Sequence, residues 1–192
     1  MARAKSFEQS EILVKAMELF WRKGYHATSV QDLVGHLGIN RASLYHAFNG
    51  KEDLFFQAFD NYRKINKSVI MEALYSQPNT KDGIRNLFEA ALKERQDRKG
   101  CFSVNLTAAL MPGDERLQEA LRDNQKAFEK IFFDYLKSGE VMGEFPRGKD
   151  LRAIASLLYT LYNGVQVISK IETAPSRQLA AVEQVLEFLE VE

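Results

Sequence analysis

Five polar side chains that could bind nucleic acid lie close together, between residues 41 and 51. Arg41 can donate two hydrogen bonds to a guanine edge, and the Ser43 hydroxyl can contact a base or a phosphate. Tyr45 and His46 can donate hydrogen bonds to phosphate oxygens. Lys51 is expected to open a helix, whose free N–H groups and positive dipole end would complete a phosphate site. The residue types and their spacing therefore indicate contact with DNA.

Two short helices joined by the tight turn "LGIN" are predicted to position these side chains. Ser29 can cap the first helix, with Asp32 three residues on, and Gly38 ends it. Asn40 can cap the second helix, "RASLYHAF", which stops at Asn49. This is helix-turn-helix spacing. The second helix, on the order of 12 Å long, suits the ~12 Å wide major groove of B-DNA.

The second short helix is expected to turn one face inward and the other outward. Leu44, Ala47 and Phe48 follow the i, i+3, i+4 rule, so we expect them to pack against Leu33 and Leu37. An alternative for one residue stays open, because a tyrosine here could also be a half-buried core residue. The side chains left at the helix start or on its outer faces are Arg41, Ala42, Ser43, Tyr45 and His46.

The rest of the chain also has helical periodicity, and no segment resembles a series of strands or an internal repeat. We therefore predict an all-α fold of about nine helices: an N-terminal helix-turn-helix domain over 1–52 and a helical regulatory domain over 53–192. Besides the elements above, helices are expected from Ile12 to Gly24, over 51–75, from Ile84 to about Arg98, and over 102–110, 117–135, 151–168 and 175–189, with a polar connection at 138–150.

The last two helices each carry a narrow apolar seam with alternating spacings of three and four, which suits helix-on-helix packing. We predict that this seam forms a dimer interface. The alternative is that both helices are internal, or that one face closes the core while further apolar residues (Leu157, Tyr159, Tyr162, Val185, Phe188) meet a partner. The seam residues are Leu151, Ile154, Leu158, Leu161, Val165, Ile168, Leu179, Val182, Leu186 and Leu189.

The stretch "ILVKAMELFWRKGYHATSVQDLVGHLGINRASLYHAFNGKEDLFFQAF" resembles the N-terminal DNA-binding domain of TetR-family transcriptional regulators. The resemblance rests on an aromatic-Gly-Tyr helix end, a Thr-Ser pair, Leu-Gly-Ile in the turn, Leu-Tyr-x-x-Phe and Lys-Glu-x-Leu. One departure is Asn49-Gly50, where the family usually has Ser before the lysine. The resemblance implies that Thr28 and Ser29 contact phosphate, that Gln31, Arg41, Ala42 and Ser43 read bases, and that Tyr45, His46 and Lys51 clamp the backbone.

The same resemblance implies a homodimeric repressor on a palindromic double-stranded DNA operator, with half-sites ~34 Å apart. A small-molecule inducer would bind the regulatory half and oppose DNA binding. Aromatic and polar residues of the middle helices are candidates for that ligand site, although such a stripe is more often core than pocket. The candidates are Phe88, Phe102, Asn105, Phe128, Phe132, Tyr159 and Tyr162.

The single cysteine, Cys101, lies in "RKGCFSVN", which resembles a subgroup of TetR-like proteins at this junction. Arg98, Lys99 and a nearby helix N-terminus would favour its thiolate, as in a sensor of electrophiles or oxidants. The alternative is a small buried apolar residue.

Composition and motifs narrow the remaining classes. Net charge is zero, but residues 1–51 hold seven Lys/Arg against four Asp/Glu, a balance of +3 that fits a DNA-binding module. No apolar run approaches the ~20 residues that span a bilayer, and no secretory signal is present, so we expect a cytoplasmic protein.

His26, His36 and His46 lack metal-site spacing, so neither a metal nor a cofactor is expected. No catalytic motif indicates an enzyme. A helical scaffold with a silent DNA module remains an alternative.

Overall fold

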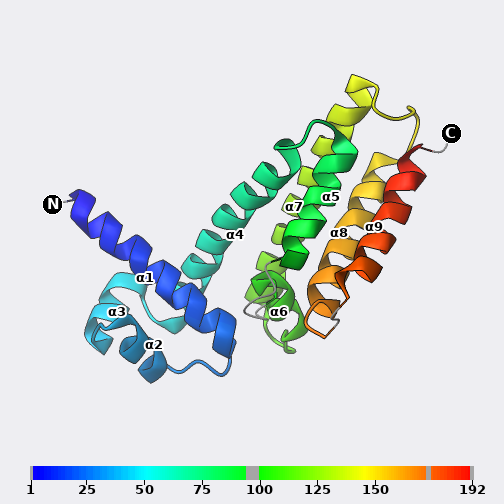
Figure 1. Ribbon diagram of the computed structural model, residues 1–192. Helices are drawn as coiled ribbons and strands as arrows, with labels where there is room; N and C mark the ends of the chain where they lie inside the picture. Colours follow the sequence, from blue (N-terminus) through cyan, green and yellow to red (C-terminus); the bar gives the residue numbers. More distant parts are fainter. Residues whose placement is uncertain (1, 94–99, 172–173, 191–192) are drawn as a thin grey trace. The chain divides into compact units, whose positions relative to one another are not determined.

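The computed structural model describes residues 2–93, 100–171 and 174–190, and these form nine α-helices and no strand (Figure 1). The all-α prediction is confirmed. Internal contacts divide the chain into two compact units, Met1–Asn66 and Lys67–Glu192. The division therefore falls inside α4 (Lys51–Tyr75), later than the expected boundary after residue 52.

The first unit contains α1 (Ala2–Lys23), α2 (Val30–Leu37), α3 (Arg41–Phe48) and the start of α4. The predicted caps are confirmed: Ser29 and Asp32 form a capping box on α2, and the Asn40 side chain accepts a hydrogen bond at the start of α3. Gly38 ends α2 in the left-handed conformation, with φ of 67°. These local signals fix the turn that presents α3.

Apolar side chains from α1, α2, α3 and α4 form the core of this unit. Phe20, Leu33, Leu44 and Phe48 are buried, and the Phe20 ring meets Phe55 edge-on at 5.2 Å. The inward orientation predicted for Ala47 is wrong, because this side chain is exposed. On so short a helix, the i and i+4 pair Leu44 and Phe48 fills the contact with the core by itself, and position 47 lies on the flank.

The second unit contains the rest of α4 and five further helices. They are α5 (Thr80–Lys93), α6 (Phe102–Ala108), α7 (Glu115–Met142), α8 (Leu151–Ile168) and α9 (Pro175–Glu190). Within this unit α8 packs on α7, and α9 lies beside α8 and packs on α5 (Figure 1). The predicted extension of α5 to about Arg98 lies outside the described residues.

Helix α7 continues to Met142, where the sequence predicted a polar connection from Ser138 onward. Close packing explains the difference. A Cβ on Gly139 would lie only 2.1 Å from the Thr80 hydroxyl oxygen, so glycine here allows the helix to approach α5 rather than breaking it. The helix ends one turn later, at Gly143, with φ of 77°.

Most residues of the α8–α9 seam pack into the core of their own chain. Leu161 and Leu179 are partly buried against this core, and Ile168 is exposed. The spacing of the seam shows that a helix packs on a helix, but not whether that second helix belongs to the same chain. The seam residues buried in the core are Leu151, Ile154, Leu158, Val165, Val182, Leu186 and Leu189.

Two polar contacts join distant parts of the second unit. The buried Tyr135 hydroxyl donates to the Leu74 carbonyl oxygen at 2.7 Å, and burial raises the pKa of Tyr135 to about 12. Arg85 of α5 binds both carboxylate oxygens of Glu183 on α9, at 2.5 and 2.9 Å. None of the described helices is long and apolar enough to cross a membrane.

Candidate nucleic-acid interface and regulatory pocket

Helix α3 presents the predicted base-reading residues on one exposed surface. The Ser43 N–H donates to the Asn40 side-chain oxygen at 2.7 Å, which fixes the first turn. Tyr45 is 45% exposed, so it is not a core tyrosine. The Arg41 guanidinium lies 5.6 Å from the centre of the Tyr45 ring. The exposed set comprises Arg41, Ala42, Ser43, Tyr45 and His46.

Lys51 lies at the first residue of α4, close to α3 in sequence. Its ammonium sits 4.5 Å from the centre of the Tyr25 ring, a cation–π contact. Burial lowers the pKa of Lys51, while the Asp32 carboxylate partly opposes this. An ammonium held over a ring at a helix N-terminus is a suitable partner for an anion.

The Asn49-Gly50 departure from the family pattern forms the junction between α3 and α4. Asn49 ends α3 with φ of 59°, and its side-chain amide donates to Asp53 at 2.9 Å. A Cβ on Gly50 would meet the Tyr45 ring at 3.3 Å, so the missing side chain leaves room for that ring. The sequence identified Asn49 as a stop signal, but nothing in it indicated the contact between Gly50 and Tyr45.

The structure corrects the role expected for Thr28. This side chain is only 1% exposed, and its hydroxyl donates to the Gly24 carbonyl oxygen at 2.6 Å. Its hydroxyl is therefore used to hold the turn between α1 and α2 and does not reach a phosphate. A threonine hydroxyl just before a helix cap can donate either to a nearby backbone carbonyl or to a phosphate, so the residue type alone did not distinguish the two roles.

Ser29 and Gln31 are exposed at the start of α2. Ser29 donates both its N–H and its hydroxyl to one oxygen of Asp32, at 2.7 and 2.6 Å, and Lys23 pairs with the same oxygen at 2.6 Å. The hydrogen bonds from Lys23 and Ser29 hold the pKa of Asp32 well below its usual range. Gln31 has no side-chain partner among the described residues, so its amide is available to a ligand.

A cavity of about 530 Å³ opens between α6, α7 and α8. Of the predicted ligand-binding residues only Tyr159 lines it, and burial raises the pKa of its hydroxyl. The sequence missed the others, since they are apolar and polar residues that only the packing of α6, α7 and α8 brings together. The complete lining is Val104, Thr107, Ala108, Leu110, Gln118, Leu121, Arg122, Gln125, Tyr159, Thr160, Asn163, Gly164 and Val167.

The remaining candidates from the aromatic stripe do not line this cavity. Tyr162 packs against Phe88 at 5.6 Å and Phe128 at 6.1 Å between ring centres, and these rings are buried in the core. Phe132 and Phe102 are also buried. On α6, the Asn105 side chain accepts a hydrogen bond from Lys170.

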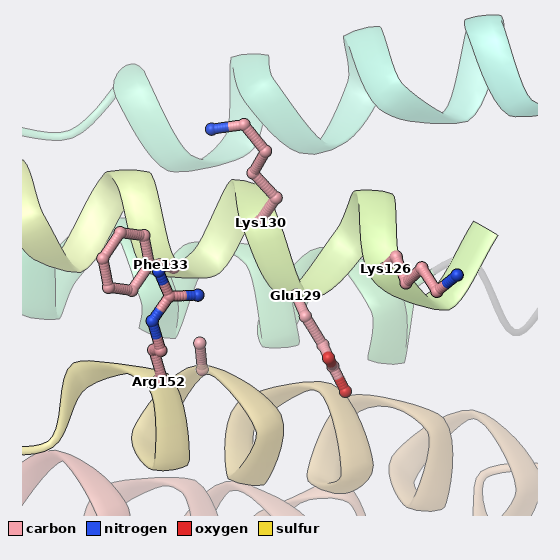
Figure 2. A pocket seen from close by; sticks show the side chains of 6 residues that line it. Lys126, Glu129, Lys130, Phe133 and Arg152 are labelled. Atoms are coloured by element: carbon pink, nitrogen blue, oxygen red, sulfur yellow. The ribbon is translucent and has the colours of Figure 1, made fainter. Parts of the chain in front are cut away.

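A second cavity, of about 430 Å³, lies on the surface between α7 and α8 (Figure 2). The Arg152 guanidinium lies 4.8 Å from the centre of the Phe133 ring, and Glu129 extends toward α8, where Ser156 donates to it at 3.3 Å. Lys130 pairs with Asp134 at 2.8 Å. The charged side chains that line this second cavity therefore already have partners within the chain.

Cys101 is buried at the N-terminus of α6, with its sulfur 3.0 Å from the Ser103 hydroxyl oxygen. This burial favours the small buried residue over the sensor thiol, because a sensor must be reached by its reagent. Arg98 and Lys99, which were expected to favour the thiolate, lie outside the described residues. Among the residues that the structure covers, no three His, Cys, Asp or Glu side chains gather where they could hold a metal ion.

Several large apolar side chains of α8 and α9 are exposed, and together they are called the exposed apolar surface. It includes Leu157, Val167 and Ile168 on α8 and Phe188 on α9. Leu157 and Leu158 show how the seam and this surface differ, since the first is exposed and the second is fully buried. Leu157 and Phe188 were predicted from the sequence as apolar residues beyond the seam that could meet a partner, whereas Ile168 was assigned to the seam and Val167 was not named.

Comparison with known proteins identifies the family. Residues 12–58 match the family model for bacterial regulatory proteins of the tetR family. The chain is 32% identical over 175 residues to YezE of Bacillus subtilis (strain 168), an HTH-type transcriptional regulator of uncharacterised role, covering 89% of this chain and 90% of that protein. The chain belongs to the TetR family. It is accordingly a helix-turn-helix transcriptional regulator.

Two further relatives carry more specific descriptions. The HTH-type transcriptional repressor ComR of Escherichia coli (strain K12) is 27% identical over 172 residues, covering 88% of this chain and 82% of ComR. A solved structure of a cysteine variant of the TetR-family regulator CifR, in complex with 26-base-pair operator DNA, matches with a TM-score of 0.82. It is 26% identical, over 92% of this chain and 93% of that one. The fold and the family are thus shared along nearly the whole chain, not only in the DNA-binding unit.

Proposed function

We propose that this TetR-family regulator is a homodimeric repressor that binds a palindromic double-stranded DNA operator and is released by a small-molecule inducer. The observation that carries the proposal is the exposed surface of α3, where a capped first turn holds Arg41, Ser43 and Tyr45 outward. The repressor ComR and the operator complex of CifR support it as relatives.

On α3, Arg41 would read a guanine and Ser43 a neighbouring base or phosphate, with Ala42 in contact with a thymine methyl group. Tyr45 and His46 would donate to phosphate oxygens and set the register of the helix on the duplex. Lys51 would bind a further phosphate at the N-terminus of α4. In this proposal residues 1–52 read the operator and residues 53–192 regulate it.

Two residues of α2 would complete the DNA contact. The Gln31 amide, which has no partner among the described residues, would reach a base. Ser29 would act through its position at the helix N-terminus, because its hydroxyl already donates to Asp32. Thr28 is left out of this set.

The homodimer would form through the exposed surface of α8 and α9. A two-fold dimer places the same patch of both subunits in contact, and Leu157, Val167, Ile168 and Phe188 supply apolar area for it. Two α3 helices would then reach half-sites ~34 Å apart in successive major grooves. Such a repressor would act in the cytoplasm, where it meets the chromosome.

The inducer would occupy the cavity between α6, α7 and α8. By linkage, a ligand that weakens operator binding must itself be weakened by the operator, to the same factor. A ligand preferring one arrangement of these helices would therefore shift the chain away from the DNA-binding form.

Selection of binding sites from random duplex DNA tests the proposal. A palindrome with half-site centres about one turn apart would establish a dimeric, sequence-specific regulator. The absence of enrichment at low salt, where phosphate contacts are strongest, would contradict it. The sequence obtained would also provide the probe for inducer experiments.

A further inference from the structure

We infer that the cavity between α6, α7 and α8 binds an organic monoanion with an apolar body, held at its charged end by Arg122. This rests on the proposed function, and it assigns a ligand class to the inducer site. A medium-chain carboxylate is the simplest molecule of that class.

The walls of the cavity suit an apolar body. Helix α6 and the turn after it supply Val104, Ala108 and Leu110, while α7 and α8 supply Leu121 and Val167. Its volume of about 530 Å³ lies within the range of ~300–1,000 Å³ in which proteins bind small molecules. The cavity therefore offers enough apolar surface for a molecule of eight or so carbon atoms.

Most polar groups of the lining already donate their hydrogen bonds within the protein. The Thr107 hydroxyl donates to the Ser103 carbonyl at 2.9 Å, and the Thr160 hydroxyl donates to the Ser156 carbonyl at 2.9 Å. On α8, the Asn163 amide donates to the Tyr159 carbonyl at 2.8 Å. These side chains therefore shape the cavity, but they offer few hydrogen-bond donors to a ligand.

Unused donors lie on the α7 wall of the cavity. Arg122 and Gln118 are four residues apart and face the cavity, and neither has a side-chain partner among the described residues. None of the lining residues is acidic. The only formal charge at the cavity is thus one guanidinium without a carboxylate, and guanidinium pairs best with a planar, bidentate anion such as a carboxylate.

The α7 helix offers a matched control for this charge. Lys126 is one turn further along, is exposed like Arg122, and lines the cavity of Figure 2 rather than this one. Lys126→Gln and Arg122→Gln remove the same charge from the same helix. Only the second should affect a ligand bound between α6, α7 and α8.

The test is isothermal titration calorimetry of the full chain with octanoate, 1-octanol and octylammonium, which share one alkyl chain and differ in charge. Octanoate is expected to bind about ten-fold more tightly than octanol, since a charge-assisted hydrogen bond is stronger than a neutral one. Octylammonium should bind most weakly. Arg122→Gln should bring octanoate to the level of octanol, whereas Lys126→Gln should leave the order unchanged.

A variant whose new side chain fills the cavity tests whether octanoate binds there. A Cβ on Gly164 would have no atom within 4 Å, so Gly164→Leu can place a side chain in the cavity without a clash at the backbone. This variant should lose octanoate binding. Persistent binding in Gly164→Leu, equal affinities for octanoate and octanol, or no binding by any of the three molecules would each overturn the inference.

The outcome for the repressor is read separately, by fluorescence anisotropy of the chain on its selected operator. Calorimetry needs no DNA, so it reports on the cavity even if operator binding fails. Conversely, an operator complex with no octanoate binding would leave the repressor proposal intact and remove the ligand class.

Discussion

The proposed dimer surface predicts different effects for substitutions at two neighbouring leucines, Leu157 and Leu158. Leu157 is 45% exposed and Phe188 is 60% exposed, whereas Leu158 is fully buried in its own chain. In a two-fold dimer each substitution acts twice. Replacing Leu157 and Phe188 together by alanine should therefore weaken the dimer without unfolding the chain.

The size of the effect follows from the exposed fractions. Fully burying a large apolar side chain contributes ~1.5–3 kcal/mol, so burying what remains exposed on both residues in both subunits contributes about 3–6 kcal/mol. Alanine keeps part of this area, so we expect the dimer dissociation constant to rise by roughly 100-fold. Leu158→Ala should instead lower the free energy of unfolding by about 2–5 kcal/mol, because it opens a cavity in the core.

Sedimentation velocity over a range of concentrations gives the dissociation constant, and urea unfolding gives the stability. Val141→Ala, which removes an exposed apolar side chain from α7, serves as the control and should change neither quantity. If the double variant dimerises as the wild type does, α8 and α9 do not meet the partner through this surface. If it chiefly loses stability, the assignment of these two side chains to the exterior is wrong.

Three further predictions concern the operator, an ion pair and the thiol. Arg41→Ala should chiefly relax sequence preference, whereas Tyr45→Phe should weaken binding to operator and random DNA alike, by about ten-fold or less. Competition binding assays measure both effects. An equal loss of discrimination in the two variants would count against these roles. Glu183→Gln should lower the free energy of unfolding at pH 7 by about 1 kcal/mol or less. Because the hydrogen bonds from Arg85 lower the pKa of Glu183 below its ordinary 4.5, that contribution is present above this value and is lost as pH falls. The difference between the urea melts of both proteins should therefore shrink as pH falls below 4.5, and a constant difference would refute the linkage. Cys101, being buried, should react with a disulfide reagent at least about ten-fold more slowly in the native chain than in denaturant; equal rates would restore the sensor reading.

The sequence predicted the first unit well because its signals are local. Ser29, Gly38 and Asn40 each satisfy or release backbone groups within a few residues, so the helix ends could be read directly from residue types. The wrong predictions in this unit concern which side chains are buried: Ala47 is exposed and Thr28 is buried. Whether a side chain on a helix flank or turn is covered depends on neighbours from other elements.

Prediction was weaker in the second unit because its features depend on long-range packing. Gly139 resembled a helix breaker but lies inside α7, where Thr80 of another helix approaches it closely. Aromatic residues such as Phe88 and Phe132 were candidates for ligand contact, yet large apolar side chains are the ones that a core buries first. The cavity forms instead between three helices, and its lining mixes apolar and polar side chains.

The position of α8 links the two proposals made for the second unit. Val167 lines the cavity between α6, α7 and α8 and also belongs to the exposed apolar surface of α8. A ligand that changes the spacing of α7 and α8 would therefore act on a helix that also faces the second subunit. Differential affinity for two such arrangements is all that a population shift requires. The inducer need not reach α3: it has only to favour an arrangement of α8 whose dimer holds the two reading helices at the wrong separation for one turn of DNA.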